Sequence, residues 1–183
     1  MIVPDVLADQ LTLVLCGTAP SRASKEARAY YAHPGNIFWK TLFEVGLTPR
    51  LLTPADYREV LNFGLGLTDL NKTEWGADAD LSHEGFDVDE FVRKMRRYRP
   101  AMIAFDSKFA ACKFFGTRTV QYGLQPQTLD GIPLFVAPST SGRARMYFDR
   151  THWEELGRFF HDQLADLKQR EGIAQSNYRR PSQ

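Results

Sequence analysis

Short apolar runs that alternate with helical segments constrain the fold of this chain more than any other feature. Residues 11–15, 63–70, 101–105 and 134–137 form apolar runs that are typical of buried strands. Segments with apolar side chains at helical spacing separate these runs. Strands that alternate with helices predict a mostly parallel sheet with helices on both faces. We therefore expect an α/β fold, a single three-layer α/β/α sandwich.

Helix-start and helix-stop residues place the helices between these strands. Asp87 and Thr151 each have a glutamate three residues later, which predicts N-caps of the capping-box type. Thr53 followed by Pro54 predicts a further helix start, and Gly116 predicts a helix stop. The other expected helices cover residues 36–45, 87–98, 107–115 and 151–167.

Length and composition limit the class of protein. A chain of 183 residues with 43% hydrophobic residues can bury the core of one domain. We expect this domain over residues 1–170 and a polar, disordered tail over residues 171–183. The sequence shows no long apolar run and no signal-peptide pattern, so we expect no membrane partner. Its two cysteines, Cys16 and Cys112, suit a reduced cytoplasmic location.

Three polar loops follow predicted strands and are expected to form one site. They cover residues 17–36, 69–85 and 139–145. Ligands of open α/β sheets bind at the carboxyl ends of the strands, where such loops converge. Asp69 ends an apolar run, so its carboxylate is a candidate for orienting or deprotonating a water, or for stabilising positive charge on a sugar. Alternatively, Asp69 only caps a turn.

The first loop combines residues that suit a pocket for a nucleobase. Tyr30 and Tyr31 are candidates for stacking on a base, and we expect one of the two to pack into the domain instead. His33 precedes a proline, and we expect it to brace the loop, because a lone histidine is a poor metal site. Asn36 either caps the following helix or presents its amide to a base edge.

The third loop combines hydroxyl groups, a glycine and an arginine. The side chains from Ser139 to Ser141 and free backbone N–H groups suit contacts with phosphate, and Arg143 is long enough to reach into a duplex. The alternative is an ordinary strand-to-helix turn. The cationic residues between Arg93 and Arg99 are more typical of a solvated helix face than of a nucleic-acid patch.

Five motifs in a fixed order carry a family resemblance. They are GTAPS at 17–21, AHPGNIFWK at 32–40, GLGLTDL at 64–70, YGLQP at 122–126 and PSTSGR at 138–143. Together they resemble the mismatch-specific uracil-DNA glycosylase and thymine-DNA glycosylase family, within the uracil-DNA glycosylase superfamily. The resemblance covers residues 13–164, which is nearly the whole chain.

The resemblance implies an enzyme of DNA repair. It implies a monofunctional glycosylase that flips uracil out of double-stranded DNA, chiefly from G·U mismatches, and removes the base by hydrolysis. The product is an abasic site, and other deaminated or modified bases remain open as substrates. The resemblance implies double-stranded DNA as the partner, and we expect no metal or other cofactor and a monomeric protein.

The resemblance also assigns roles to residues. Gly17 and Thr18 would form the floor of the pocket, Tyr31 would stack on the base, and Asn36 would contact the base or help to hold the water. Arg143 lies at the position of the side chain that fills the hole left by the flipped base. The residues expected to contact DNA are Lys108, Ser139, Ser141, Gly142 and Arg143.

Ala19 departs from the family pattern and changes the expected mechanism. The family usually has an asparagine at this position, and that residue positions the attacking water, whereas a methyl group can neither donate nor accept a hydrogen bond. We expect Asp69 to take over this role. One alternative is a protein of weak or no activity that binds lesions or abasic sites. Another is an enzyme for free nucleotides or nucleosides, which would have no use for Arg143 as a wedge.

Overall fold

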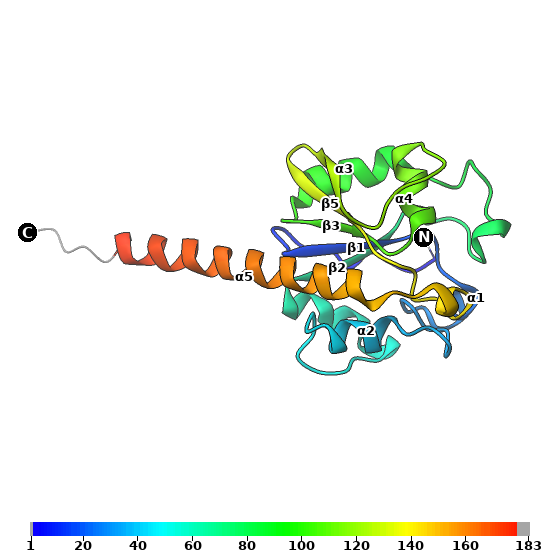
Figure 1. Ribbon diagram of the computed structural model, residues 1–183, viewed down its shortest axis with the longest axis horizontal. Helices are drawn as coiled ribbons and strands as arrows, with labels where there is room; N and C mark the ends of the chain where they lie inside the picture. Colours follow the sequence, from blue (N-terminus) through cyan, green and yellow to red (C-terminus); the bar gives the residue numbers. More distant parts are fainter. Residues whose placement is uncertain (1, 179–183) are drawn as a thin grey trace, which may run out of the picture.

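The computed structural model describes residues 2–178 and contains one five-stranded sheet at the centre of the molecule (Figure 1). The strands lie in the order β2-β1-β3-β5-β4. The first four are parallel, and β4 runs antiparallel to β5 at one edge. The predicted mostly parallel sheet is confirmed. The strands are β1 (Leu13–Gly17), β2 (Leu65–Asp69), β3 (Ile103–Phe105), β4 (Gly123–Leu129) and β5 (Ile132–Val136).

Helices cover both faces of the sheet. The helices are α1 (Arg22–Ala27), α2 (Phe38–Glu44), α3 (Val88–Tyr98), α4 (Lys108–Phe115) and α5 (Arg150–Tyr178), with 3₁₀ helices η1 (Pro54–Phe63), η2 (Asp78–Asp80) and η3 (Gly142–Tyr147). In Figure 1, α3 and α4 lie on one side of the sheet and α2 lies on the other. None of the described helices is long and apolar enough to cross a membrane.

The period-two alternation of strand side chains divides the core between the two faces. In β1, Leu13 and Leu15 pack with residues of α2, η1 and α5. Val14 and Cys16 point the other way and pack with residues of α3 and α4. Both faces of the central strand are therefore buried, which explains why its sequence is continuously apolar. The three-layer sandwich predicted from the sequence is confirmed.

The edge strand β4 was not predicted. Four of its seven residues are exposed, and Gln125, Gln127 and Thr128 interrupt any apolar run. It pairs with β5 through the turn at Asp130 and Gly131, which both have positive φ. An Asp-Gly pair between two strands is a strong hairpin signal, and this pair would have revealed the strand.

Two helix boundaries differ from the predictions. Helix α1 lies within the segment expected to be a loop, and the hydroxyl of Ser21 caps it by accepting a hydrogen bond from Ser24 N. The predicted capping box of Thr151 and Glu154 is wrong. Helix α5 begins at Arg150, and Asp149 accepts the hydrogen bond from Thr151 N. Aspartate competes well with threonine as a cap.

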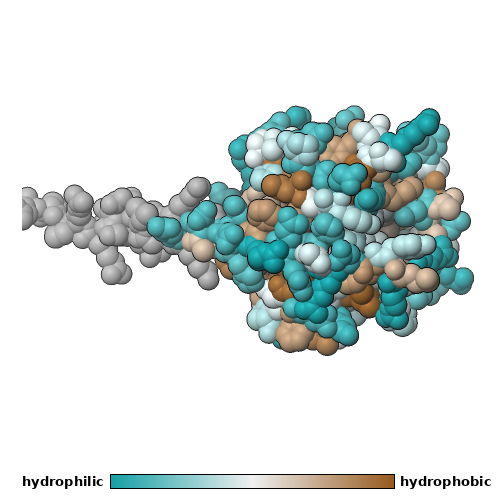
Figure 2. Space-filling model, in the orientation of Figure 1, coloured by the Kyte–Doolittle hydropathy of each residue, from teal (hydrophilic) through white to brown (hydrophobic). Residues whose placement is uncertain are grey.

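Helix α5 extends beyond the end predicted for it. It continues to Tyr178, and its C-terminal part projects away from the α/β body (Figure 1). Of the predicted polar tail, residues 179–183 lie outside the described residues. On the face of the body shown in Figure 2, small hydrophobic areas are interspersed with hydrophilic residues.

Candidate active site

A cleft of about 1030 Å³ opens at the carboxyl ends of the strands. Residues of all three loops predicted to converge line it, so that expectation is confirmed. We call Gly17, Tyr31, Asp69 and Asp106 the floor of the cleft, and residues 139–147 with Lys108 its rim. The four floor residues, most of the rim residues, and Thr18, Ala19 and Asn36 line the cleft.

Gly17 lies at the centre of the floor because it ends β1, which has β2 and β3 on its two sides. A Cβ atom on Gly17 would lie 2.5 Å from Oδ1 of Asp69 and 3.4 Å from both Oδ2 of Asp106 and Oη of Tyr31. Glycine therefore lets these three side chains converge. Because Oδ1 of Asp69 and Oδ2 of Asp106 both lie within 3.4 Å of this Cβ position, the two carboxyl groups are neighbours.

Asp69 is the last residue of β2 and is only 5% exposed. Burial raises the pKa of its carboxyl group to about 6, although the nearby charge of Lys72 opposes the rise. Nζ of Lys72 lies 3.5 Å from Oδ2 of Asp69 and donates a hydrogen bond of 2.9 Å to Oη of Tyr30. Asp69 is thus ionised at neutral pH and has a cation beside it.

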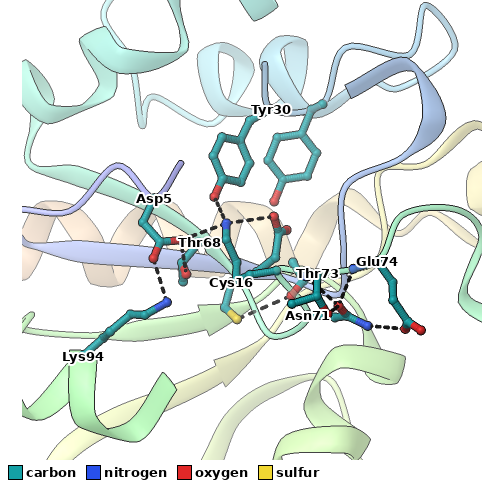
Figure 3. Close-up of polar contacts among 12 residues, drawn as sticks. Asp5, Cys16, Tyr30, Thr68, Asn71, Thr73, Glu74 and Lys94 are labelled. Carbon is teal, nitrogen blue, oxygen red and sulfur yellow. Dashed lines mark hydrogen bonds and ion pairs between the residues drawn. The ribbon is translucent and has the colours of Figure 1, made fainter. Parts of the chain in front are cut away.

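A buried ion cluster holds Lys72 in place. Its Nζ lies 2.9 Å from Oδ1 of Asp5, and Nζ of Lys94 lies 2.7 Å from Oδ2 of the same carboxylate. Thr68 donates a hydrogen bond of 2.8 Å to Asp5. Burial alone would raise the pKa of Asp5, but the charge of Lys72 and the hydrogen bonds lower it. Asp5, Tyr30, Thr68 and Lys94 converge from separate segments (Figure 3).

This ion cluster was missed in the sequence. Lys72 follows Asp69 by three residues, and that spacing was its one local signal. Asp5 has no such signal because its partners lie far along the chain. The prediction that one of the two tyrosines packs into the domain is confirmed by Tyr30, which is buried in the core.

Asp106 was also missed, although it follows β3 in the same way that Asp69 ends β2. It is 9% exposed, and burial raises the pKa of its carboxyl group to about 7. Oη of Tyr31 donates a hydrogen bond of 2.7 Å to Oδ2 of Asp106, which lowers the pKa, while the charge of Asp69 raises it. The signal in the sequence was an acidic residue directly after an apolar run.

Tyr31 is fixed in position from several sides. Its backbone has a φ of 51°, in the left-handed region that non-glycine residues seldom adopt. Its ring stacks on Phe38 with centroids 3.5 Å apart, and the ring of Trp39 approaches edge-on. One ring face is therefore covered by the protein. The stacking of the other face on a base stays a prediction.

Asn36 and His33 shape the first loop. Oδ1 of Asn36 accepts a hydrogen bond of 2.9 Å from the backbone N–H of Phe38, the first residue of α2, and Asn36 also lines the cleft. Nδ1 of His33 accepts a hydrogen bond of 3.0 Å from Gly35 N, as expected of a bracing residue. Backbone N–H of Ile37 donates to the carbonyl of Thr140 at 3.0 Å. The first and third loops are therefore joined.

Thr18 and Ala19 line the wall next to the floor. Oγ1 of Thr18 lies 3.5 Å from Oγ of Ser107, and its carbonyl accepts a hydrogen bond of 2.9 Å from Asn71 N. The methyl group of Ala19 can neither donate nor accept a hydrogen bond. Of the two groups, the carboxylate of Asp69 alone can hold a water.

The rim is far more exposed than the floor. Oγ of Ser139 lies 3.2 Å from Oγ of Ser141, and Arg143 is exposed. Met146 and Tyr147 are 91% and 79% exposed. Nζ of Lys108 lies 4.1 Å from the centre of the Tyr122 ring, an interaction that keeps this cation beside the cleft. The predicted contacts of these residues with DNA stay predictions.

Neither the cleft nor any other part of the described chain contains three or more His, Cys, Asp or Glu side chains grouped so as to hold a metal ion. On the floor of the cleft, the carboxyl groups of Asp69 and Asp106 and the phenol of Tyr31 are the groups that can exchange protons. Two neighbouring buried carboxyl groups with raised pKa values have the chemistry that general acid–base catalysis needs.

Comparisons with known proteins give matches that cover most of the chain. The model of the family described as "Uracil DNA glycosylase superfamily" matches residues 4–168, which include both carboxyl groups of the floor. The solution NMR structure of a candidate uracil DNA glycosylase from Methanosarcina acetivorans is similar, with a TM-score of 0.60 and 20% sequence identity. The match covers 87% of this chain and 96% of that chain. At this identity the structural likeness shows a shared fold.

Proposed function

The chain belongs to the uracil DNA glycosylase superfamily, and from this premise we propose that it removes uracil from double-stranded DNA by hydrolysis. The preferred site is a G·U mismatch, and the product is an abasic site. The observation that carries the proposal is the buried, ionised carboxylate of Asp69 on the floor of the cleft, beside a wall where Ala19 provides no amide.

The substrate base must leave the duplex to reach this floor. Both carboxyl groups are less than one-tenth exposed, so a stacked base cannot touch them. A nucleotide flipped into the cleft can, and extrusion costs least at a mismatch. The volume of about 1030 Å³ is ample for a nucleotide.

The chemical step uses Asp69 and a water molecule. The anion orients the water toward C1′ of the deoxyribose and accepts its proton. It also stabilises the positive charge that develops on the sugar as the bond to the base lengthens. Lys72 maintains Asp69 as an anion near neutral pH, because its charge opposes the effect of burial.

The remaining lining residues position the nucleotide. Tyr31 stacks on the base with the ring face that Phe38 leaves free, and Asn36 directs its side-chain NH₂ toward the base or the water. Gly17 and Thr18 border the base with backbone groups. Lys108 and the loop formed by Ser139, Ser141 and Gly142 contact the DNA backbone, and Arg143 fills the gap in the duplex.

One observation favours a second candidate function. Since Ala19 stands where the family has its water-positioning asparagine, the chain could have kept recognition and lost catalysis. Such a protein binds lesions or abasic sites in DNA but releases no base. Free uracil distinguishes the two functions, because the glycosylase releases it and the binding protein does not.

Release of uracil from a labelled duplex tests the proposal. A G·U duplex is incubated with excess protein and then treated with alkali, which breaks the strand at an abasic site. We expect breakage at the uracil, none in a G·C duplex, and unchanged activity in Asp162→Asn, an exposed aspartate of α5. Tight binding of the G·U duplex without breakage after hours would replace the proposal with the binding function.

A further inference from the structure

We propose that Asp106 is a second catalytic residue, whose carboxyl group gives a proton to the departing base while Asp69 takes a proton from water. This inference rests on the proposed function. It extends that function from one active carboxylate to a pair with divided roles.

The sheet brings the two carboxyl groups together. Asp69 pairs in register with Gly17, and Asp106 follows Phe105, which pairs with Cys16 on the other side of β1. Both aspartates therefore emerge from strands next to β1. Because Oδ1 of Asp69 and Oδ2 of Asp106 both lie close to the Cβ position of Gly17, one nucleotide bound above Gly17 can touch both groups.

The surroundings of the two groups differ in charge. Asp69 has the ammonium group of Lys72 at 3.5 Å, which favours the anion. Among the described residues, Asp106 has no such ion pair, and its side-chain hydrogen bond comes from the neutral hydroxyl of Tyr31. Tyr31 donates its hydrogen bond to Oδ2, the carboxyl oxygen of Asp106 that lies beside Gly17. The environment thus favours one proton on the pair, carried by Asp106.

The pKa values agree with this division. Burial, together with the charges of Asp69 and Asp78, raises the pKa of Asp106 to about 7, although the hydrogen bond from Tyr31 opposes the rise. Burial raises that of Asp69 only to about 6. A further titratable neighbour, the thiol of Cys16, is neutral because burial raises its pKa well above the usual range.

The proposed reaction balances in atoms and charge. The bond between C1′ and the base nitrogen breaks, and its electron pair stays with the base, which takes the proton of Asp106. The water oxygen bonds to C1′, and its proton goes to Asp69. The pair begins and ends with one proton: the proton of Asp106 leaves with the base, and Asp69 carries the proton taken from water. Transfer between these neighbours, directly or through solvent, restores the starting state.

The alternative is that Asp106 only anchors Tyr31. A general acid matters most when the leaving group is poor, whereas an anchor affects all leaving groups alike. Uracil and 5-fluorouracil separate these roles, because fluorine makes the base a better leaving group without adding a hydrogen-bond donor.

The test measures single-turnover release of uracil and 5-fluorouracil from otherwise identical mismatched duplexes by wild type and Asp106→Asn. We expect Asp106→Asn to slow uracil release by roughly 100-fold and to slow 5-fluorouracil release much less. An equal loss on both bases would overturn the role of Asp106 as an acid. If the wild type releases neither base, the proposed function itself fails, and the inference fails with it.

Tyr31→Phe provides a second measurement in case Asp106→Asn releases neither base. This change removes the hydrogen bond that lowers the pKa of Asp106 and keeps the aromatic ring. We expect the alkaline limb of the rate–pH profile to move to higher pH. An alkaline limb that stays at its wild-type position would show that Asp106 does not act as the acid.

Discussion

The floor and the rim of the cleft differ in the secondary structure that carries them and in their exposure to solvent. The floor stands on the ends of paired strands, and its two aspartates are 5% and 9% exposed. The rim stands on a loop and a short 3₁₀ helix, where Met146 is 91% exposed. Strand pairing fixes the atoms that must meet a reacting bond, while exposed loop side chains suit a large partner whose shape varies.

A methyl group added at one glycine of the floor and at one glycine of the rim tests this difference. The floor variant is expected to have the largest effect of all the changes considered. In Gly17→Ala the new Cβ would lie 2.5 Å from Oδ1 of Asp69, so the carboxylate must move. We expect a loss of activity of at least about 100-fold, because small displacements at a reacting centre have effects of that size. In Gly142→Ala the Cβ would lie 3.2 Å from the carbonyl oxygen of Gly35, and we expect a loss of only a few-fold.

Base release under single-turnover conditions measures both variants, with circular dichroism to verify that they fold. Equal losses in Gly17→Ala and Gly142→Ala would mean that the floor is no more demanding in geometry than the rim.

Removing the rim cation should affect binding rather than chemistry. For Arg143→Ala we expect duplex affinity to fall about tenfold and the salt dependence of binding to weaken by roughly one charge. The rate at saturating protein should change much less. Titrations at several salt concentrations measure this, with Arg158→Ala on the exposed side of α5 as the matched control. An unchanged salt slope would remove Arg143 from the DNA interface.

Removing the cation beside Asp69 should shift the pH dependence of the rate of base release. In Lys72→Met the charge that opposes the raised pKa of Asp69 is lost, so Asp69 stays protonated to higher pH. We expect the acidic limb of the rate–pH profile to shift upward, with partial recovery of activity at alkaline pH. Lys40→Met, at an exposed site on α2, serves as the control. A limb at the wild-type position would separate Lys72 from the titration of Asp69.

The raised pKa values also predict how stability depends on pH. Asp69 and Asp106 bind more protons in the folded protein than in the unfolded chain between the ordinary aspartate pKa of 3.8 and about 7, so their contribution to the free energy of unfolding falls as the pH rises through this window. In Asp106→Asn one contribution to that fall is absent. Relative to wild type, the variant should gain on the order of 3 kcal/mol between pH 4 and pH 8.

Denaturant titrations at the two pH values measure this gain. The same difference at both values would mean that Asp106 does not carry a raised pKa in the folded protein.

The sequence predicted those parts of the molecule that depend on local patterns. The alternation of apolar runs and helices was sufficient for the layers of the fold, and Asp69 was found because it ends an apolar run. The edge strand β4 escaped because its exposed side chains carry no apolar pattern. Asp106 had the same local signal as Asp69 but lay outside the family motifs.

Other parts could not be predicted from local patterns at all. Asp5 meets Thr68 and Lys94 across 63 and 89 residues, and only the folded chain joins them. The stacking of Tyr31 on Phe38 depends on a left-handed backbone conformation at Tyr31, which its residue type does not favour. Contacts across the chain and strained conformations are the features that the structure adds.

The rate of uracil release by Asp69→Asn, measured alongside its affinity for the same G·U duplex, tests the central claim most directly. Asparagine keeps the shape of the side chain and removes its negative charge. We predict that release falls by at least about 100-fold while affinity stays within a few-fold of wild type. Release at the wild-type rate would contradict the account, because the chemistry would then not depend on the carboxylate at the floor of the cleft.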